Sequence, residues 1–186
     1  MSRLYSPAIL AAEIAKWCAV VDLPKLTIVS GGQTGADRAA LDFAIEYGFL
    51  HDGWCPRGRL AEDGPIAARY QLRETPARRY AQRTEWNVRD SDGTVVFSIA
   101  RQTVGGTRLT LAIAQRLGRP CLHLSRDEVA ASTDGATAAI AESAGRLVAF
   151  LDEHSIRRLN IAGPRASQEP AIGVFVSQVL EAALNA

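Results

Sequence analysis

The chain has 186 residues, with 21 Lys and Arg against 20 Asp and Glu, so its formal net charge is +1. This balance argues against general nucleic-acid binding, which is typical of strongly basic domains. The length fits one domain, and no apolar run approaches the ~20 residues that a membrane span needs.

The first predicted elements are a helix at about 8–20 and a short apolar strand at 26–30. The strand is rich in β-branched residues, which is typical of a buried parallel strand. A glycine-rich turn follows and leads into a helix that ends near Gly48, because apolar residues recur there at helical spacing. The next section, about 49–83, is rich in Gly, Pro and Arg and shows no clear period. We expect it to be an irregular insertion or lid, since a loop of this length is usually functional.

From the insertion onward, strands alternate with helices. This pattern predicts an α/β fold, a Rossmann-like doubly wound and mainly parallel sheet with helices on both faces. We expect one such domain over residues 1–186. The predicted elements are helices at about 77–88, 105–117, 136–154 and 170–184, and strands at 94–98, 120–124 and 159–162.

The turn after the first strand is the strongest local signal for a ligand. It resembles a dinucleotide-binding turn in which Ser30 replaces the first glycine. Glycines let the backbone approach an anion, and the helix that follows offers free N–H groups at its positive end. The alternative is a tight turn with no ligand. The predicted binding residues are Ser30, Gly31, Gly32, Gln33, Thr34, Gly35 and Asp37, the last as a helix cap or as a partner of a ligand hydroxyl.

Further binding candidates come from three other segments. A second strand-to-helix entry repeats the first signal, and it would face the first across a switch point of the sheet. The loop after the last strand offers an arginine, and the insertion offers an aromatic ring beside an arginine. The alternatives are an ordinary turn and a surface cluster that satisfies itself. These candidates are Gly105, Gly106, Thr107, Arg165, Trp54 and Arg57.

Evidence for catalysis is weaker. Glu62, Asp63 and Glu85 are the candidates for a general acid or base on a nucleotide derivative. The three histidines share no metal-ligand spacing, and no nucleophile elbow occurs. On a helix, Arg83, Asn87 and Asp90 would share one face, for which a solvated surface is the alternative.

Six blocks of the sequence together resemble the family named putative molybdenum carrier. That family is similar in fold to the lysine-decarboxylase-like, or LOG-type, Rossmann proteins that bind nucleotides. The resemblance covers about residues 26–165. The blocks are Ser30-Gly-Gly-Gln-Thr-Gly-Ala-Asp-Arg38, Gly53-Trp-Cys-Pro-Arg-Gly58, Ala61-Glu-Asp-Gly-Pro65, Arg83-Thr-Glu-Trp-Asn-Val-Arg-Asp90, Gly105-Gly-Thr107 and Leu159-Asn-Ile-Ala-Gly-Pro-Arg165.

The resemblance implies a Rossmann-like domain that forms a homo-oligomer, a dimer or a tetramer, and binds a molybdopterin-type or nucleotide-like ligand. One departure concerns catalysis. LOG-type phosphoribohydrolases carry a Gly-Gly-x-Gly-Thr-x-x-Glu block, and Thr110 stands where its Glu is expected. This puts hydrolysis in doubt and leaves anion binding at the second helix entry intact.

The sequence therefore favours a binding or carrier protein for a phosphate-bearing heterocycle, such as the molybdenum cofactor or a nucleotide. The alternative is an enzyme that hydrolyses or processes a nucleotide derivative. We expect no protein-ligated metal site, no membrane partner and no general nucleic-acid partner. Three cysteines without a Cys-x-x-Cys pair and a start without a signal-peptide layout favour a cytoplasmic location.

Overall fold

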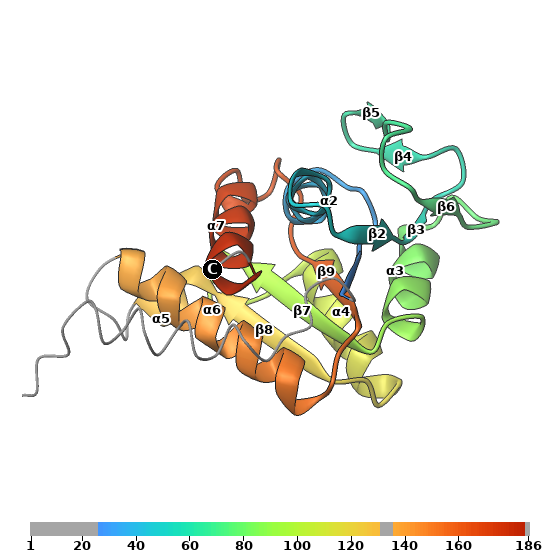
Figure 1. Cartoon of the computed structure of the whole chain (residues 1–186). Coiled ribbons are helices and arrows are strands. Elements are labelled where there is room, and N and C mark those ends of the chain that lie inside the picture. The colour runs from blue at the N-terminus through green and yellow to red at the C-terminus, as the bar shows by residue number, and fades with distance from the viewer. Residues whose placement is uncertain (1–25, 131–135, 185–186) are drawn as a thin grey trace, which may run out of the picture.

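The computed structural model describes residues 26–130 and 136–184. A five-stranded sheet runs through its centre, and every strand pair in it is parallel (Figure 1). The strand order across the sheet is β2-β1-β9-β7-β8. The bounds are β1 Thr27–Val29, β2 Leu50–Asp52, β7 Gly93–Ser98, β8 Cys121–Ser125 and β9 Arg158–Ala162. The Rossmann-like α/β fold is thus confirmed, and the helix expected at 8–20 lies outside the described residues.

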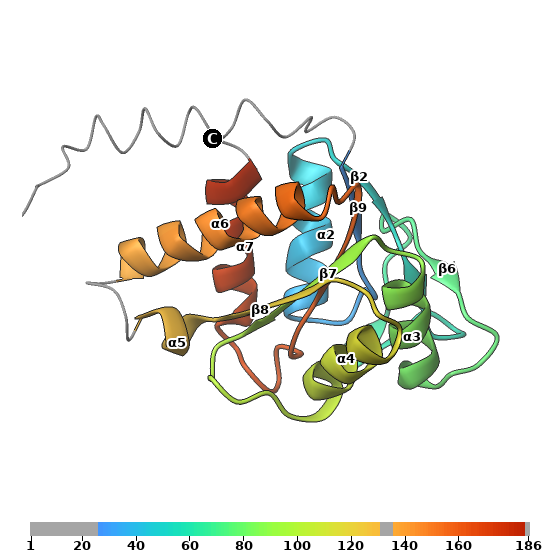
Figure 2. The same ribbon diagram turned by 90° about the horizontal axis from the view of Figure 1, so that it is seen from below.

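Helices cover both faces of the sheet (Figure 2). On one face lie α2 (Ala36–Glu46), α6 (Ala136–Glu153) and α7 (Ile172–Leu184), and on the other lie α3 (Tyr80–Arg89) and α4 (Gly105–Arg116). These helices match the predicted ones to within a few residues. The short helix α5 (Arg126–Ala130), which follows β8 directly, was not predicted.

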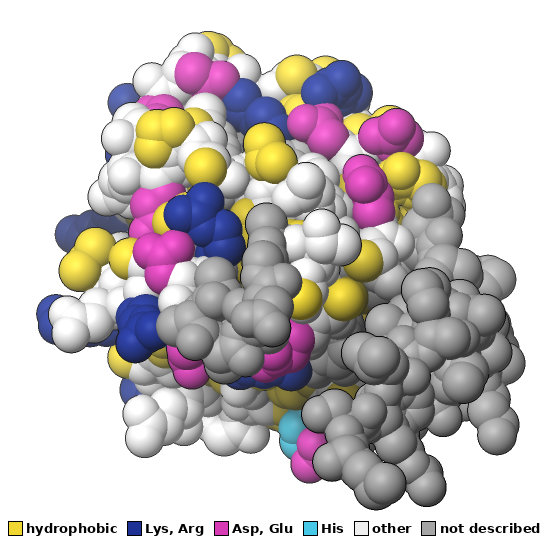
Figure 3. Space-filling view, turned by 90° about the vertical axis from the view of Figure 1, so that its left-hand side faces the viewer, with side chains coloured by type: hydrophobic (Ala, Val, Ile, Leu, Met, Phe, Trp, Pro, Cys, Tyr) yellow, Lys and Arg dark blue, Asp and Glu magenta, His cyan; other side chains and the backbone are white. Residues whose placement is uncertain are grey.

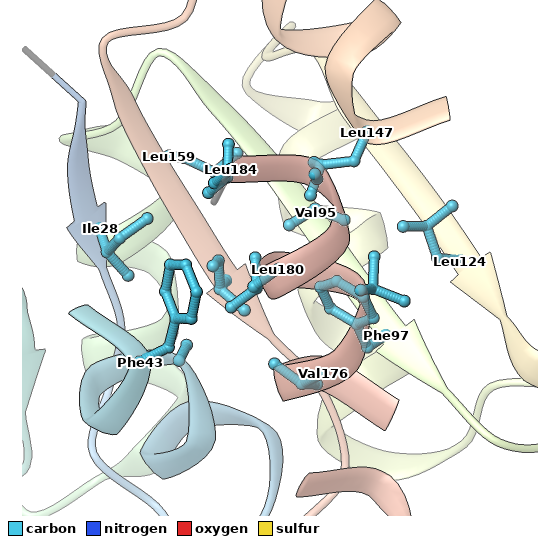
Figure 4. Close-up of a cluster of buried hydrophobic side chains, with 14 of the residues drawn as sticks. Ile28, Phe43, Val95, Phe97, Leu124, Leu147, Leu159, Val176, Leu180 and Leu184 are labelled. Atoms are coloured by element: carbon cyan, nitrogen blue, oxygen red, sulfur yellow. The ribbon is translucent and has the colours of Figure 1, made fainter. Parts of the chain in front are cut away.

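The main core lies between the sheet and α7 (Figure 4). Helix α7 is apolar along most of its length, so it is buried on several sides rather than along one stripe. The close-up shows its side chains packed among residues of the sheet, α2 and α6. The labelled core residues are Ile28, Phe43, Val95, Phe97, Leu124, Leu147, Leu159, Val176, Leu180 and Leu184.

The strand order becomes the familiar one for doubly wound sheets when β9 is counted first. The series β9, β1, β2, β7, β8 then has the spatial order 3-2-1-4-5, and a helix lies in each connection that the chain makes between these strands. In this series the strands run outward from β9 through β1 to β2 on one side and resume at β7 on the other, so the order reverses between β9 and β7. Open α/β sheets bind ligands at the carboxyl ends of strands at such a point.

The section from 49 to 83 is more ordered than its sequence suggests. Its first residues form β2, an edge strand of the main sheet, and the rest makes two small strand pairs beyond that edge (Figure 1). Strand β2 has only three residues and Leu50 is 64% exposed, so no apolar run marks it. The small pairs are β3 (Trp54–Cys55) with β6 (Arg73–Glu74), and β4 (Leu60–Ala61) with β5 (Gly64–Pro65).

One arginine organises this insertion. The Arg59 guanidinium donates hydrogen bonds to the carbonyl oxygens of Ile66, Ala67, Tyr70 and Leu72, at 2.8 to 3.1 Å. A small apolar cluster lies beside it and includes Leu41 of α2. The insertion is therefore anchored to the main domain by its own packing. The cluster consists of Leu41, Cys55, Ile66, Tyr70 and Leu72.

The surface carries mixed charge. On the face in Figure 3, basic side chains (dark blue) alternate with acidic ones (magenta), with small groups of hydrophobic side chains between them. This agrees with the net charge of +1. In the described part of the chain, no helix combines the length and the apolarity that a bilayer crossing requires.

Candidate functional site

A cavity opens at the carboxyl edge of the sheet, between the end of β9 and the beginning of α4, which follows β7. We call it the β9 cavity. Its empty space, with the open mouth included, is about 690 Å³. It is lined by Gln33, Asp37, Tyr80, Ala81, Arg83, Thr84, Asn87, Gly106, Thr107, Leu109, Thr110, Asn160, Ala162, Gly163, Arg165 and Gln168.

The first turn of α4 presents backbone N–H groups to this cavity. The helix has no side-chain cap at Val104 and no acidic residue in its first turn. A Cβ added at Gly105 or Gly106 would meet nothing within 4 Å, so the backbone there is open to an incoming group. The helix dipole gives this end a partial positive charge. An anion can therefore approach Gly106 and Thr107 closely.

Gln33 lines the same cavity, and its side-chain amide is held in one orientation. Its side-chain Oε1 accepts hydrogen bonds from the backbone N–H groups of Thr34 (3.0 Å) and Glu62 (2.9 Å), so the orientation of the amide is set. Its Nε2 is buried and has no hydrogen-bond partner among the described residues. An unsatisfied buried donor costs about 1–3 kcal/mol, and a ligand acceptor would remove that cost.

Arg83 and Asp37 form a buried ion pair beside Gln33. Arg83 Nη1 lies 2.7 Å from Asp37 Oδ2, and the two side chains are 13% and 4% exposed. The guanidinium lies against Gly31, where any Cβ would overlap it. Asp37 also accepts a hydrogen bond from the backbone N–H of Gln33 at 3.3 Å. The carboxylate thus orders the glycine loop and holds Arg83 at the cavity.

The glycine loop after β1 is covered by other parts of the protein. A Cβ at Gly32 would lie 2.6 Å from Leu72 Cδ1 of the insertion, and one at Gly35 would lie 2.6 Å from the carbonyl oxygen of Pro164. Ser30 is buried, and its hydroxyl donates to the carbonyl of Ile161 at 2.8 Å. The predicted residues Ser30, Gly31, Gly32, Thr34 and Gly35 are not among those that line the β9 cavity.

Glu62 connects the insertion to the loop after β9. Its carboxylate accepts hydrogen bonds from the Ser167 hydroxyl, the Ser167 backbone N–H and the Thr34 hydroxyl. The bonds from Ser167 and Thr34 hold the pKa of the Glu62 carboxyl below its ordinary value. Arg165 Nη1 lies 3.6 Å from the same carboxylate, and its guanidinium is 5.9 Å from the centre of the Tyr80 ring. Arg165 and Tyr80 both line the cavity.

The other candidates of the insertion lie outside the lining of the cavity. Trp54 is enclosed by its neighbours: Arg73 stacks over its ring at 4.2 Å and Trp86 meets it edge-on. Its indole N–H donates to Asp90 at 2.8 Å. Arg57 is exposed and lies in the loop between β3 and β4. Neither residue is among those that line the β9 cavity.

The remaining carboxylate candidates are engaged in ion pairs at the surface. Asp63 lies 2.5 Å from Arg38 and Glu85 lies 2.8 Å from Arg116. The hydrogen bond from Arg38 holds the pKa of Asp63 below its ordinary value. Together with Glu62, these residues are absent from the lining of the β9 cavity, where the only carboxylate among the described lining residues is Asp37.

Five of the predicted residues line the cavity, and they come from the loops or first helical turns that follow three strands of the sheet: Gln33, Asp37, Gly106, Thr107 and Arg165. The prediction missed Tyr80 and Gln168, which have no motif around them, and Asn160, which lies in the block Leu159–Arg165 but was not singled out. Arg83 and Asn87 were noted only as members of one helical face. They are not on a solvated surface, because Asn87 is buried and its amide exchanges two hydrogen bonds with the backbone of Trp54.

No group of three or more His, Cys, Asp or Glu side chains in the described parts of the chain could hold a metal ion. What the cavity does offer is a set of donors: backbone N–H groups, amides and arginines.

The sheet topology and the cavity at its switch point define a Rossmann-like α/β protein. The chain belongs to the family described as "Circularly permutated YpsA SLOG family", whose model matches residues 28–184. The strand order explains this description, since β9, the first strand of the usual order, comes last in the chain.

A solved structure supports the same relationship. The chain is similar to the putative molybdenum carrier protein from Syntrophus aciditrophicus SB, with 44% sequence identity and a TM-score of 0.80 over 87% of this chain and 96% of that one. Among proteins of curated function, none matches the chain. The family and this relative support a ligand-binding role in general.

Proposed function

We propose that this protein binds a phosphate-bearing heterocyclic ligand, a nucleotide or the molybdenum cofactor, in the β9 cavity. The observation that carries the proposal is the open first turn of α4, which has no side-chain cap and no acidic residue. The backbone N–H groups of Gly106 and Thr107 would bind the phosphate, as helix N-termini commonly do.

Arg165 supplies the mobile positive charge for this ligand. Its contact with Glu62 is long, at 3.6 Å, and Glu62 already has three hydrogen bonds from Ser167 and Thr34. Arg165 can therefore turn to a phosphate without leaving that carboxylate unpaired. Arg83 is different, because its ion pair with Asp37 is buried and must be kept. The half-exposed ring of Tyr80 offers a face for the heterocycle.

Binding is favoured over hydrolysis by the chemistry of the cavity. The carboxylate of Asp37 is committed to Arg83, and Thr110 uses its hydroxyl to bond the carbonyl of Gly106. Neither is placed as a free general base. The molybdenum cofactor is included as a ligand because the Syntrophus relative is named a putative molybdenum carrier protein. The phosphate of that cofactor would bind at the open first turn of α4.

Substitution of Gly106 tests the proposal. Gly106→Asp places a negative charge in the first turn of α4, where a carboxylate stabilises the helix but repels a phosphate. Because a Cβ fits there freely, we expect a folded protein with an unchanged or higher Tm. Its affinity for AMP, GMP or isolated molybdenum cofactor, measured by calorimetry, should fall at least about tenfold.

Gly106→Asn is the matched control, since it has the same shape without the charge. We expect its affinity to stay within about threefold of the unmodified protein, a difference of less than 1 kcal/mol. Equal affinities of the Asp and Asn variants would refute the anion site. Release of free base from the nucleotides would instead support the hydrolase alternative.

A further inference from the structure

A second cavity adjoins the first on the other side of the α4 entry. We call it the β7 cavity. It shares Thr107 and Gln168 with the β9 cavity and encloses about 540 Å³, its open mouth included. The two spaces therefore meet at the first turn of α4, where the proposed function places a phosphate. The β7 cavity is lined by Ser98, Thr103, Val104, Thr107, Pro164, Gln168 and Glu169.

The two cavities differ in chemistry. The β9 cavity contains Arg83 and Arg165, whereas the lining of the β7 cavity has no arginine or lysine and one carboxylate, Glu169. Glu169 accepts a hydrogen bond from the backbone N–H of Ile99 at 2.6 Å, which fixes it at the end of β7. A second phosphate would meet this negative charge. A neutral group that carries hydroxyls could instead form hydrogen bonds with the carboxylate and the hydroxyl side chains that line this cavity.

From this arrangement, and resting on the proposed function, we infer that the ligand has two organic arms joined through phosphate. One arm is a heterocycle in the β9 cavity, and the other is an uncharged, hydroxyl-bearing group such as a sugar in the β7 cavity. The phosphate linkage lies between them at Gly106 and Thr107. The substrate class is thus a phosphodiester or diphosphate diester, such as a dinucleotide or a nucleotide sugar, rather than a nucleoside monophosphate.

A phosphate monoester would leave the β7 cavity empty. A two-armed ligand would also contact Val104, which is 70% exposed without it, and would gain from burying that side chain. Gln168 lines both cavities and would lie beside the linkage. These are the contacts that distinguish the two ligand classes.

The test compares one-armed and two-armed ligands with the same base and the same diphosphate. We expect ADP-ribose to bind at least tenfold more tightly than ADP, or GDP-mannose at least tenfold more tightly than GDP, in calorimetry on the whole chain. Val104→Trp fills the β7 cavity from an exposed position, so it should abolish this gain and leave ADP or GDP binding within twofold.

Leu50→Trp is the control, because Leu50 is similarly exposed but lies at the opposite edge of the sheet, beside the beginning of β1. It should leave all four affinities unchanged. Thr103→Phe fills the same cavity from the next position and replaces Val104→Trp if that variant lowers the Tm. The inference is overturned if ADP-ribose and GDP-mannose each bind less than tenfold more tightly than ADP and GDP. It is also overturned if the higher affinity of the two-armed ligands persists in the cavity-filling variants. Either result leaves the proposed function standing. Absence of binding by all four ligands overturns the inference, and it overturns the proposed function as well if isolated molybdenum cofactor also fails to bind.

Discussion

Gly31 shows how one residue can be required for packing where its motif suggests a ligand. The space that its missing side chain leaves is taken by the guanidinium of Arg83. The same holds for Gly32, which faces Leu72, and for Gly35, which faces the loop after β9. Glycine permits close approach of any group, whether a phosphate or a side chain. At this loop the approaching groups belong to the protein itself.

The buried pair of Arg83 and Asp37 makes a prediction for stability. Arg83→Met should lower the free energy of unfolding by about 3–5 kcal/mol, because it leaves the carboxylate of Asp37 buried without a partner. The double variant Asp37→Asn with Arg83→Met should recover part of that loss. Urea unfolding of the single and double variants measures both. A single variant that costs less than about 1 kcal/mol would show that the pair is not buried in solution.

The residue types of the site could be predicted in part. Gln33 and Arg165 follow strands within a few residues, and Gly106 and Thr107 begin the helix after β7, so the sheet pattern alone places them at one edge. Asn160 lies within a strand and Tyr80 at the beginning of a helix, with no turn or glycine to mark them. Trp54 was predicted as a stacking platform, but its face is covered by Arg73. A sequence shows that a ring is present and does not show what lies over it.

At the scale of elements, the insertion is attached to the β9–α7 loop by a single carboxylate. Glu62 lies on the insertion, and its partners Ser167 and Thr34 lie on two loops of the main domain. This connection covers the glycine loop and leaves the first turn of α4 open. It also explains why the first of the two predicted phosphate sites is closed and the second is accessible.

The pH dependence of this connection follows from Glu62. Its pKa is lowered in the folded protein, from an ordinary value of 4.5, so its contribution to stability is complete above that value and is lost as the pH falls through the folded pKa. We expect hydrogen exchange in residues 59–74 to accelerate as the pH drops below about 4.5, after correction for the intrinsic exchange rate.

Glu62→Gln provides the comparison for this effect. The amide keeps an acceptor oxygen but does not titrate over this range, so exchange in the same segment should be faster at neutral pH and less dependent on acid. Parallel acid profiles for the two proteins would show that another group controls the insertion. Asp63 is a candidate for that group, since its ion pair with Arg38 also joins the insertion to α2.

The elements of the main domain were predicted well because their signals are local. Apolar strands and helical spacing mark β7, α4, α6 and α7 within a few residues. The small strands of the insertion have two or three residues each and are held by Arg59 and a small apolar cluster. A strand of two residues is too short to show the alternation of apolar and polar residues by which strands are recognised in a sequence. Their pairing depends on contacts across the insertion, which only the folded chain shows.

At the scale of the whole molecule, the strand order predicts that the protein tolerates circular permutation. A permutant that begins at Ser155, runs to 186, continues with 1 and ends at His154 restores the order in which β9 comes first. The new ends fall at two exposed turn residues. We expect one cooperative thermal transition with a Tm within about 5 °C of the unmodified protein. Loss of the cooperative transition would show that the connection between α6 and β9 is needed for the fold.

The position of β9 also determines when the protein can fold during its synthesis. β9 is the central strand of the sheet, yet it is made after every other strand, and its hydrogen bond from Ser30 to Ile161 spans 131 residues. Until the ribosome has made it, β1 with β2 and β7 with β8 are two half-sheets, each with an open edge. The ligand cavity lies at the seam that β9 closes. We therefore expect the centre of the sheet and the cavity to form together, after β9 has been made.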